Sequence, residues 1–171
     1  MIYESDDPKT KLDLWILPLT GEAKPTPLLQ SSVNESQGQF SPDGKWFAYT
    51  SDETGRPEVY VQTFPPAGGK WQISGNSGSQ PSWRRDGQEL FYLDPEKKLM
   101  AVSIALEPGF EAGVPLPLFE TNVFRTDLGW NKQYAPAADG RRFLINTVLQ
   151  ETSGSQIHVV LNWQADLKKK E

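Results

Sequence analysis

Few side chains in this sequence are suited to catalysis. There is a single histidine, His158, and no cysteine. A Ser-His-Asp triad or a histidine-based zinc site would have to use that one residue. The stretch Gly75-Asn76-Ser77-Gly78-Ser79 resembles a nucleophile elbow but ends in serine where that motif has glycine. We therefore interpret His158 as an ordinary strand residue, and we predict no catalytic residue and no cofactor.

Acidic side chains offer the only other common metal ligands. The pairs Asp6-Asp7 and Asp52-Glu53 occupy equivalent places in the sequence, and oxygen atoms of this kind can hold Ca²⁺. Neither pair has the spacing of an EF-hand loop, and acids are common in exposed turns. We predict no metal site.

Composition excludes several classes of partner. The net charge is −5, so the chain lacks the basic face that nucleic acid binding requires, and the Lys168-Lys169-Lys170 run is interpreted as a solvated tail. No apolar run approaches the length of a membrane span, and the first residues lack the features of a signal peptide. We expect a soluble chain with neither a nucleic acid nor a membrane partner.

The best candidates for binding are side chains with hydrogen-bonding groups. Gln37, Gln80 and Gln133 stand at one repeated position, each six residues before an Asp-Gly pair. Their amides would form either a ring of donors and acceptors for a peptide or small ligand, or hydrogen bonds between neighbouring sheets. Other candidates are Arg84 and Arg85, which could hold an acidic group or simply be solvated, and Trp130, which could be an exposed aromatic contact or a packed side chain.

The elements that must position these residues repeat along the chain. The Asp-Gly pairs lie 43 and 53 residues apart, and the first spacing is that of a four-stranded blade. Proline fixes φ before the aspartate, and glycine allows the positive φ that a hairpin turn needs. We predict that structural turns are formed by Pro42, Asp43 and Gly44, by Asp86 and Gly87, and by Asp139 and Gly140.

The strand after each turn is apolar on both faces, which predicts sheets stacked against one another. Phe47, Ala48 and Tyr49 show this pattern in the first repeat. The expected strands are Ile2–Asp6, Leu12–Leu19, Lys24–Leu29, Trp46–Ser51, Glu58–Phe64, Lys70–Ile73, Glu89–Leu93, Leu99–Ile104, Leu116–Phe119, Arg142–Thr147 and Ile157–Trp163. No amphipathic helix of useful length is predicted.

These residues resemble a known repeat. Phe40-Ser41-Pro42-Asp43-Gly44-Lys45 with Phe47-Ala48-Tyr49 is similar to the PD40 (WD40-like) repeat of TolB-type β-propellers, and Trp83-Arg84-Arg85-Asp86-Gly87 continues the pattern. The arrangement also resembles the repeats that follow bacterial serine/threonine kinase domains. The resemblance implies an all-β fold of four-stranded antiparallel blades, with the first strand of each blade lining a central channel. It also makes an extracytoplasmic parent protein plausible.

The repeat boundaries predict about three and a half blades in one propeller-type domain. They are 1–31 (partial), 32–75, 76–120 and 130–165 (partial). Propellers have 4–8 blades, so the ends must be covered in some way. Closure of a small ring, pairing of two chains and a longer native protein are all possible, and we expect a homodimer or higher oligomer that completes the ring.

Fold and motifs favour a non-catalytic scaffold that binds a protein or small ligand, not an enzyme. Two alternatives remain open. One is a metal-dependent hydrolase or lactonase that uses the channel mouth, and the other is a structural piece of a larger propeller protein.

Overall fold

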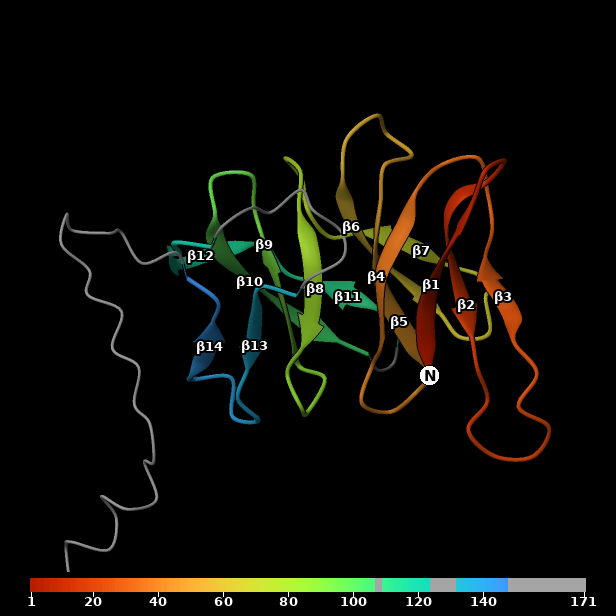
Figure 1. Cartoon of the computed structure of the whole chain (residues 1–171). Coiled ribbons are helices and arrows are strands. Elements are labelled where there is room, and N and C mark those ends of the chain that lie inside the picture. The colour runs from red at the N-terminus through yellow and green to blue at the C-terminus, as the bar shows by residue number, and fades with distance from the viewer. Residues whose placement is uncertain (107–108, 124–131, 148–171) are drawn as a thin grey trace, which may run out of the picture.

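The computed structural model describes residues 1–106, 109–123 and 132–147. Every regular secondary-structure element in these ranges is a β-strand. Within them no helix is long and apolar enough to cross a membrane. The strands form four antiparallel groups that follow one another in chain order (Figure 1). The predicted all-β fold of antiparallel blades is therefore confirmed.

The first sheet has three strands and the second has four. The first sheet has the order β1-β2-β3, formed by β1 (Ile2–Asp7), β2 (Lys11–Ile16) and β3 (Thr26–Leu29). The second has the order β4-β5-β6-β7, formed by β4 (Glu35–Phe40), β5 (Trp46–Ser51), β6 (Glu58–Thr63) and β7 (Lys70–Gln72).

The third sheet repeats the second with one addition. Its strands are β8 (Ser79–Trp83), β9 (Glu89–Leu93), β10 (Lys98–Ala105), β11 (Glu111–Ala112) and β12 (Leu116–Glu120). Both β11 and β12 pair with β10, because β10 is eight residues long and extends past β12. The sequence did not indicate β11. The fourth group has β13 (Tyr134–Pro136) and β14 (Phe143–Ile145), and the expected strand Ile157–Trp163 lies outside the described residues.

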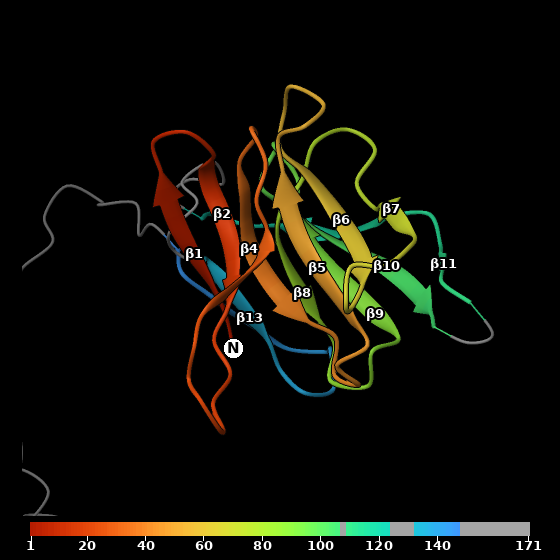
Figure 2. The same ribbon diagram turned by 90° about the vertical axis from the view of Figure 1, so that its right-hand side faces the viewer.

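Three hydrophobic cores lie between consecutive sheets. In β5, Phe47 and Tyr49 pack toward the first sheet, whereas Ala48 packs toward the third. In β9, Leu90 and Tyr92 pack toward the second sheet, whereas Phe91 packs toward the fourth group. This alternation explains why the middle strands are apolar on both faces. Figure 2 shows β5 and β6 lying beside β8 and β9.

We expected the strand after each Asp-Gly turn to be buried on both faces. For β14, at the end of the described stack, this prediction is wrong. Leu144 has the same repeat position as Ala48 and Phe91 but is 77% exposed. Its neighbours Phe143 and Ile145 pack back against the third core. The difference arises because Leu144 lies on the face of β14 that points away from the third sheet.

The three Asp-Gly pairs adopt one turn geometry. The glycines Gly44, Gly87 and Gly140 have φ of 71°, 75° and 67°. Each donates its N–H to the carbonyl oxygen three residues earlier, at 2.9 Å in all three turns. Each aspartate accepts the N–H two residues later, at 3.0–3.1 Å. The turns therefore hold the first and second strands of each repeat in the same relation.

Candidate ligand pocket on the inner strands

The inner strands of the second and third sheets contain matching bulges. Gln37 and Gln80 have positive φ, 57° and 59°, which is unusual outside glycine. Both glutamines begin a register shift, so that two residues of the inner strand lie opposite one tyrosine, Tyr49 in one sheet and Tyr92 in the other. The bulge turns each glutamine side chain toward the next sheet along the chain.

These glutamines form a relay of hydrogen bonds from sheet to sheet. The backbone N–H of Gln80 donates to Oε1 of Gln37 at 2.7 Å, and the backbone N–H of Gln133 donates to Oε1 of Gln80, also at 2.7 Å. Oε1 of Gln37 also accepts the Thr50 hydroxyl at 2.7 Å. At the start of the chain, Oε1 of Glu4 accepts the N–H of Gln37 at 2.6 Å. The hydrogen bonds from Gln80 to Gln37 and from Gln133 to Gln80 thus link neighbouring sheets.

A hollow of about 210 Å³ lies along the same strands. We call it the inner-strand pocket, and it is lined by Glu4, Gln37, Gly38, Gln39, Gln80, Pro81 and Lys132. Gln80 is only 1% exposed, and its Nε2 has no hydrogen-bond partner among the described residues. Lys132 Nζ donates to Ser82 Oγ at 3.2 Å. The pocket therefore combines an ammonium group, a buried amide nitrogen and a carboxylate.

Desolvation affects both charged groups of the pocket. Burial raises the pKa of Glu4 by more than the hydrogen bond from Gln37 lowers it. Desolvation lowers the pKa of Lys132, although the residue as a whole is exposed. Neither group forms an ion pair within the described residues. Each charge would gain from an oppositely charged group that entered the pocket.

Sequence reasoning missed Glu4, Gln39 and Lys132. Two of them could have been found as departures from the repeat. Lys132 stands one residue before the repeated glutamine, where the other repeats have Ser36 and Ser79. Glu4 stands where they have Thr50 and Leu93. The two charged departures, far apart in the sequence, line the same pocket.

The predicted binding residues Arg84 and Arg85 do not line this pocket. The Arg84 guanidinium donates to Asp86, Glu89 and Gln88, at 2.7, 2.6 and 3.2 Å. These bonds hold Arg84 within its own turn. The hydrogen bond to Arg84 is the main factor that lowers the pKa of Asp86.

Arg85 is exposed in the same turn. Trp130 and His158 lie outside the described residues.

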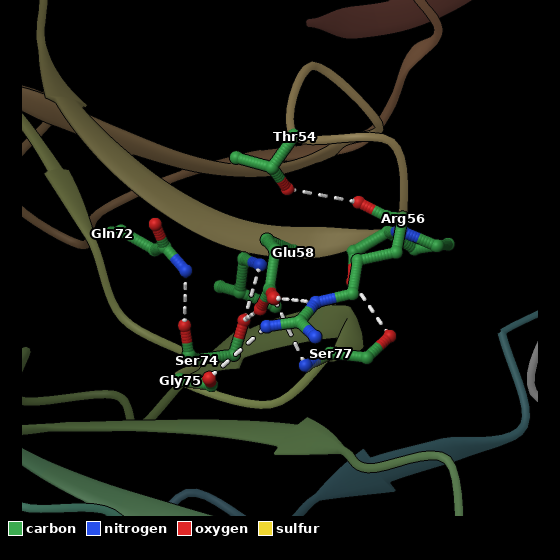
Figure 3. Close-up of polar contacts among 9 residues, drawn as sticks. Thr54, Arg56, Glu58, Gln72, Ser74, Gly75 and Ser77 are labelled. Atoms are coloured by element: carbon green, nitrogen blue, oxygen red, sulfur yellow. Dashed lines mark hydrogen bonds and ion pairs between the residues drawn. The ribbon is translucent and has the colours of Figure 1, made fainter.

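A second polar cluster surrounds Glu58, a carboxylate with no exposed surface (Figure 3). One oxygen accepts Arg56 Nε at 2.6 Å and the Ser77 N–H at 3.0 Å. The other oxygen accepts the hydroxyl of Ser74. Each of these donors belongs to the segment just before β6 or to the connection from the second to the third sheet. Both oxygens are bonded, so we assign this cluster a structural role.

Within the described ranges, no group of three or more His, Cys, Asp or Glu side chains could hold a metal ion.

Comparison with known proteins bears on the fold. No family model matches the sequence, and no curated protein matches it. A solved structure assigned as TolB from Agrobacterium tumefaciens has a TM-score of 0.51 at 15% identity, over 68% of this chain and 45% of that one.

Two further solved structures give lower scores. TolB from Acinetobacter baumannii has a TM-score of 0.46 at 21% identity, over 90% of this chain and 47% of that one. An oligogalacturonate lyase from Vibrio parahaemolyticus has a TM-score of 0.39 at 20% identity, over 67% of this chain and 28% of that one.

The chain spans less than half the length of each of these structures. At this identity the similarity concerns the fold. Together with the consecutive antiparallel sheets, it shows that this chain is built of β-propeller blades similar in fold to those of the Agrobacterium structure.

Proposed function

We propose that this chain is a non-catalytic β-propeller scaffold that binds a ligand, a small molecule or a segment of a partner protein, in the inner-strand pocket. The observation that supports the proposal is that two residues whose repeat positions hold uncharged residues in the second and third sheets, Glu4 and Lys132, both line this pocket beside the buried Gln80 amide.

The polar groups of the pocket define the chemistry of the ligand. The Lys132 ammonium and the Gln80 Nε2 group are donors, and the buried Nε2 has no partner in the part of the chain that the structure describes. A buried donor of this kind costs about 1–3 kcal/mol unless an acceptor reaches it. Glu4 uses Oε1 for Gln37, and its other oxygen makes no hydrogen bond to the described residues. A ligand with a carboxylate and, on the other side, an amino group would satisfy both ends.

Nuclear magnetic resonance can test this proposal with simple probes. The ¹⁵N-labelled chain is titrated separately with glycylglycine, acetate and methylammonium. We expect glycylglycine and acetate to shift the Gln80 side-chain amide and the Gln133 backbone amide. Glycylglycine should shift the Gln37 amide as well, because its amino group would approach Glu4.

The variant Lys132→Met should abolish these shifts, whereas Lys9→Met, which removes an exposed lysine elsewhere, should leave them unchanged. The proposal fails if none of the probes shifts these amides, or if Lys132→Met responds as the unmodified chain does.

The enzymatic alternative has no support from the described residues. A metal-dependent hydrolase or lactonase would need several acidic or histidine ligands that converge, and no such group is present in this part of the chain. No specific observation favours the other alternative, that the chain is a structural piece of a larger propeller protein. Pairing of two chains and an extracytoplasmic location, which we expected from the repeats and from the resemblance, belong to the proposal as further expectations.

A further inference from the structure

Two carboxylates are buried together between the first and second sheets. Asp13 in β2 has no exposed surface, and Glu35 at the start of β4 is 6% exposed. Oδ2 of Asp13 accepts Gln30 Nε2 at 3.0 Å and the hydroxyl of Thr10 at 2.7 Å. Oε1 of Glu35 accepts the hydroxyl of Ser31, the residue after Gln30, at 2.6 Å. We call these five residues the double-carboxylate cluster.

Each carboxylate of this cluster keeps one oxygen without a hydrogen bond. Oδ1 of Asp13 and Oε2 of Glu35 are buried, and neither has a partner among the described residues. Neither carboxylate forms an ion pair in those ranges, and Lys70, whose charge also acts on Glu35, is paired with Glu53. Desolvation raises the pKa of Glu35, the Ser31 hydrogen bond lowers it, and the charge of Asp13 raises it. Because buried charges are costly without an opposite charge, this cluster needs a cation or a proton.

The cluster around Glu58 has the equivalent place between the second and third sheets, and its charge is balanced. Glu58 begins β6 opposite Ser51, as Asp13 lies in β2 opposite Ser5. Both oxygens of Glu58 are bonded, and the Arg56 guanidinium supplies the positive charge. The first two sheets therefore differ from the next pair in how this repeated carboxylate is satisfied.

Two residues account for this difference. Glu35 stands eight residues before the Asp-Gly pair, where the next repeat has Gly78. A Cβ atom on Gly78 would lie 2.8 Å from Cβ of Ser74, whose hydroxyl donates to Glu58, so a side chain at this position points into the cluster. Lys11 takes the place of the arginine but forms no ion pair with the residues that the structure describes. The first cluster thus has one carboxylate more and one paired cation fewer.

We propose that the double-carboxylate cluster binds a calcium ion, which joins the first sheet to the second through Oδ1 of Asp13 and Oε2 of Glu35. Ca²⁺ takes about six to eight oxygen ligands and accepts neutral oxygen atoms beside carboxylates. The cluster supplies neutral oxygen atoms from the side chains of Thr10, Gln30 and Ser31. The ion would have the role that the arginine has at the next boundary.

The sequence did not indicate this site. The expectation that the chain has no metal site considered only acidic pairs within turns, whereas Asp13 and Glu35 come from different strands. With two carboxylates and three neutral groups, the cluster also differs from the groups of three or more acidic or histidine side chains that the described residues lack.

Isothermal titration calorimetry of the EDTA-treated chain with CaCl₂ at neutral pH tests this binding. We expect a single site, with MgCl₂ binding at least about tenfold more weakly, because Mg²⁺ gives up its water reluctantly. Asp13→Asn and Glu35→Gln keep the side-chain shapes and remove one charge each, so each should weaken Ca²⁺ binding about tenfold to a hundredfold. Asp6→Asn, which removes an exposed charge from the same sheet, should leave the affinity unchanged.

Urea unfolding gives a second readout, in which the order of two proteins reverses. In EDTA, Glu35→Gln should unfold at a higher urea concentration than the unmodified chain, because it removes the repulsion between two buried carboxylates. With Ca²⁺ at about a hundred times its dissociation constant, the folding equilibrium constant of the unmodified chain should rise about a hundredfold. The variant should gain little from Ca²⁺ and should then be the less stable of the two.

The inference is overturned if Ca²⁺ up to about 10 mM leaves the urea midpoint of the unmodified chain unchanged, since a shared proton or a buried water would then satisfy the two oxygens. It is also overturned if Glu35→Gln binds Ca²⁺ as tightly as the unmodified chain. In nuclear magnetic resonance spectra, Ca²⁺ should shift the backbone amides of Asp13 and Glu35. Shifts at Gln80 and Gln133 instead would place the ion in the inner-strand pocket and contradict the inference. The calcium site and the ligand pocket can therefore fail independently.

Discussion

The middle of the described stack, where the second and third sheets meet, differs from its two ends in burial and in hydrogen bonding. The same sequence repeat forms the middle and the ends. In the middle, both faces of β5 and β9 are covered, and a glutamine oxygen accepts the next glutamine's N–H. At the ends, Leu144 is exposed, and the relay begins at a partly exposed glutamate. Each face of the repeated strand thus contributes stability only where a neighbouring sheet covers that face.

The largest difference in the free energy of unfolding is expected between variants at Phe91 and Leu144, which share one repeat position. Phe91→Ala should lower the free energy of unfolding by about 4 kcal/mol, because Phe91 is 1% exposed and fills the third core. Leu144→Ala should change it by less than about 0.5 kcal/mol. Urea unfolding measures both. Similar losses in the two variants would mean that Leu144 is covered in solution, as pairing of chains would require.

A smaller difference is expected within the relay. Gln80→Ala leaves the buried Gln133 N–H without its acceptor and should cost about 2 kcal/mol. Glu4→Ala removes the acceptor of Gln37 where water has access, and should cost less than about 1 kcal/mol. Urea unfolding again measures the free energies, and hydrogen exchange should show faster exchange of the Gln133 amide in the first variant. Equal costs would mean that the end of the relay is as well shielded as its middle.

The smallest effect concerns the pH dependence of stability. Folding raises the pKa of Glu4 above its ordinary value of 4.5, so the folded chain binds more protons than the unfolded chain in this window. Stability from this group is therefore present below 4.5 and is lost as the pH rises through the folded pKa. Glu4→Gln keeps an acceptor for Gln37 but cannot ionise.

At pH values well above 4.5 this variant should be more stable than the unmodified chain by about 0.5 kcal/mol, and below 4.5 the difference should vanish. Urea unfolding at the two pH values decides this. A variant that is less stable at neutral pH would show that the charge of Glu4 contributes to the fold.

The sequence predicted most of the strands because the repeat combines turn chemistry with alternating burial. Trp46–Ser51 and Glu89–Leu93 match β5 and β9 residue for residue. The short β11 carries no such pattern, since it pairs only with the extra length of β10. The glutamines were identified by position, but their direction depends on a backbone bulge that residue types alone do not reveal. Glu4 and Lys132 could have been found only by asking at which positions the repeats differ from one another.

The cluster around Glu58 determines where the chain can accept new sequence. The connection from β7 to β8 folds back onto that carboxylate through Ser74 and Ser77, so a tag or loop inserted there would break buried bonds. By contrast, residues 65–69, between β6 and β7, are exposed. An affinity tag or fluorophore for the experiments above belongs in that turn, where it would leave the spacing of the sheets unchanged.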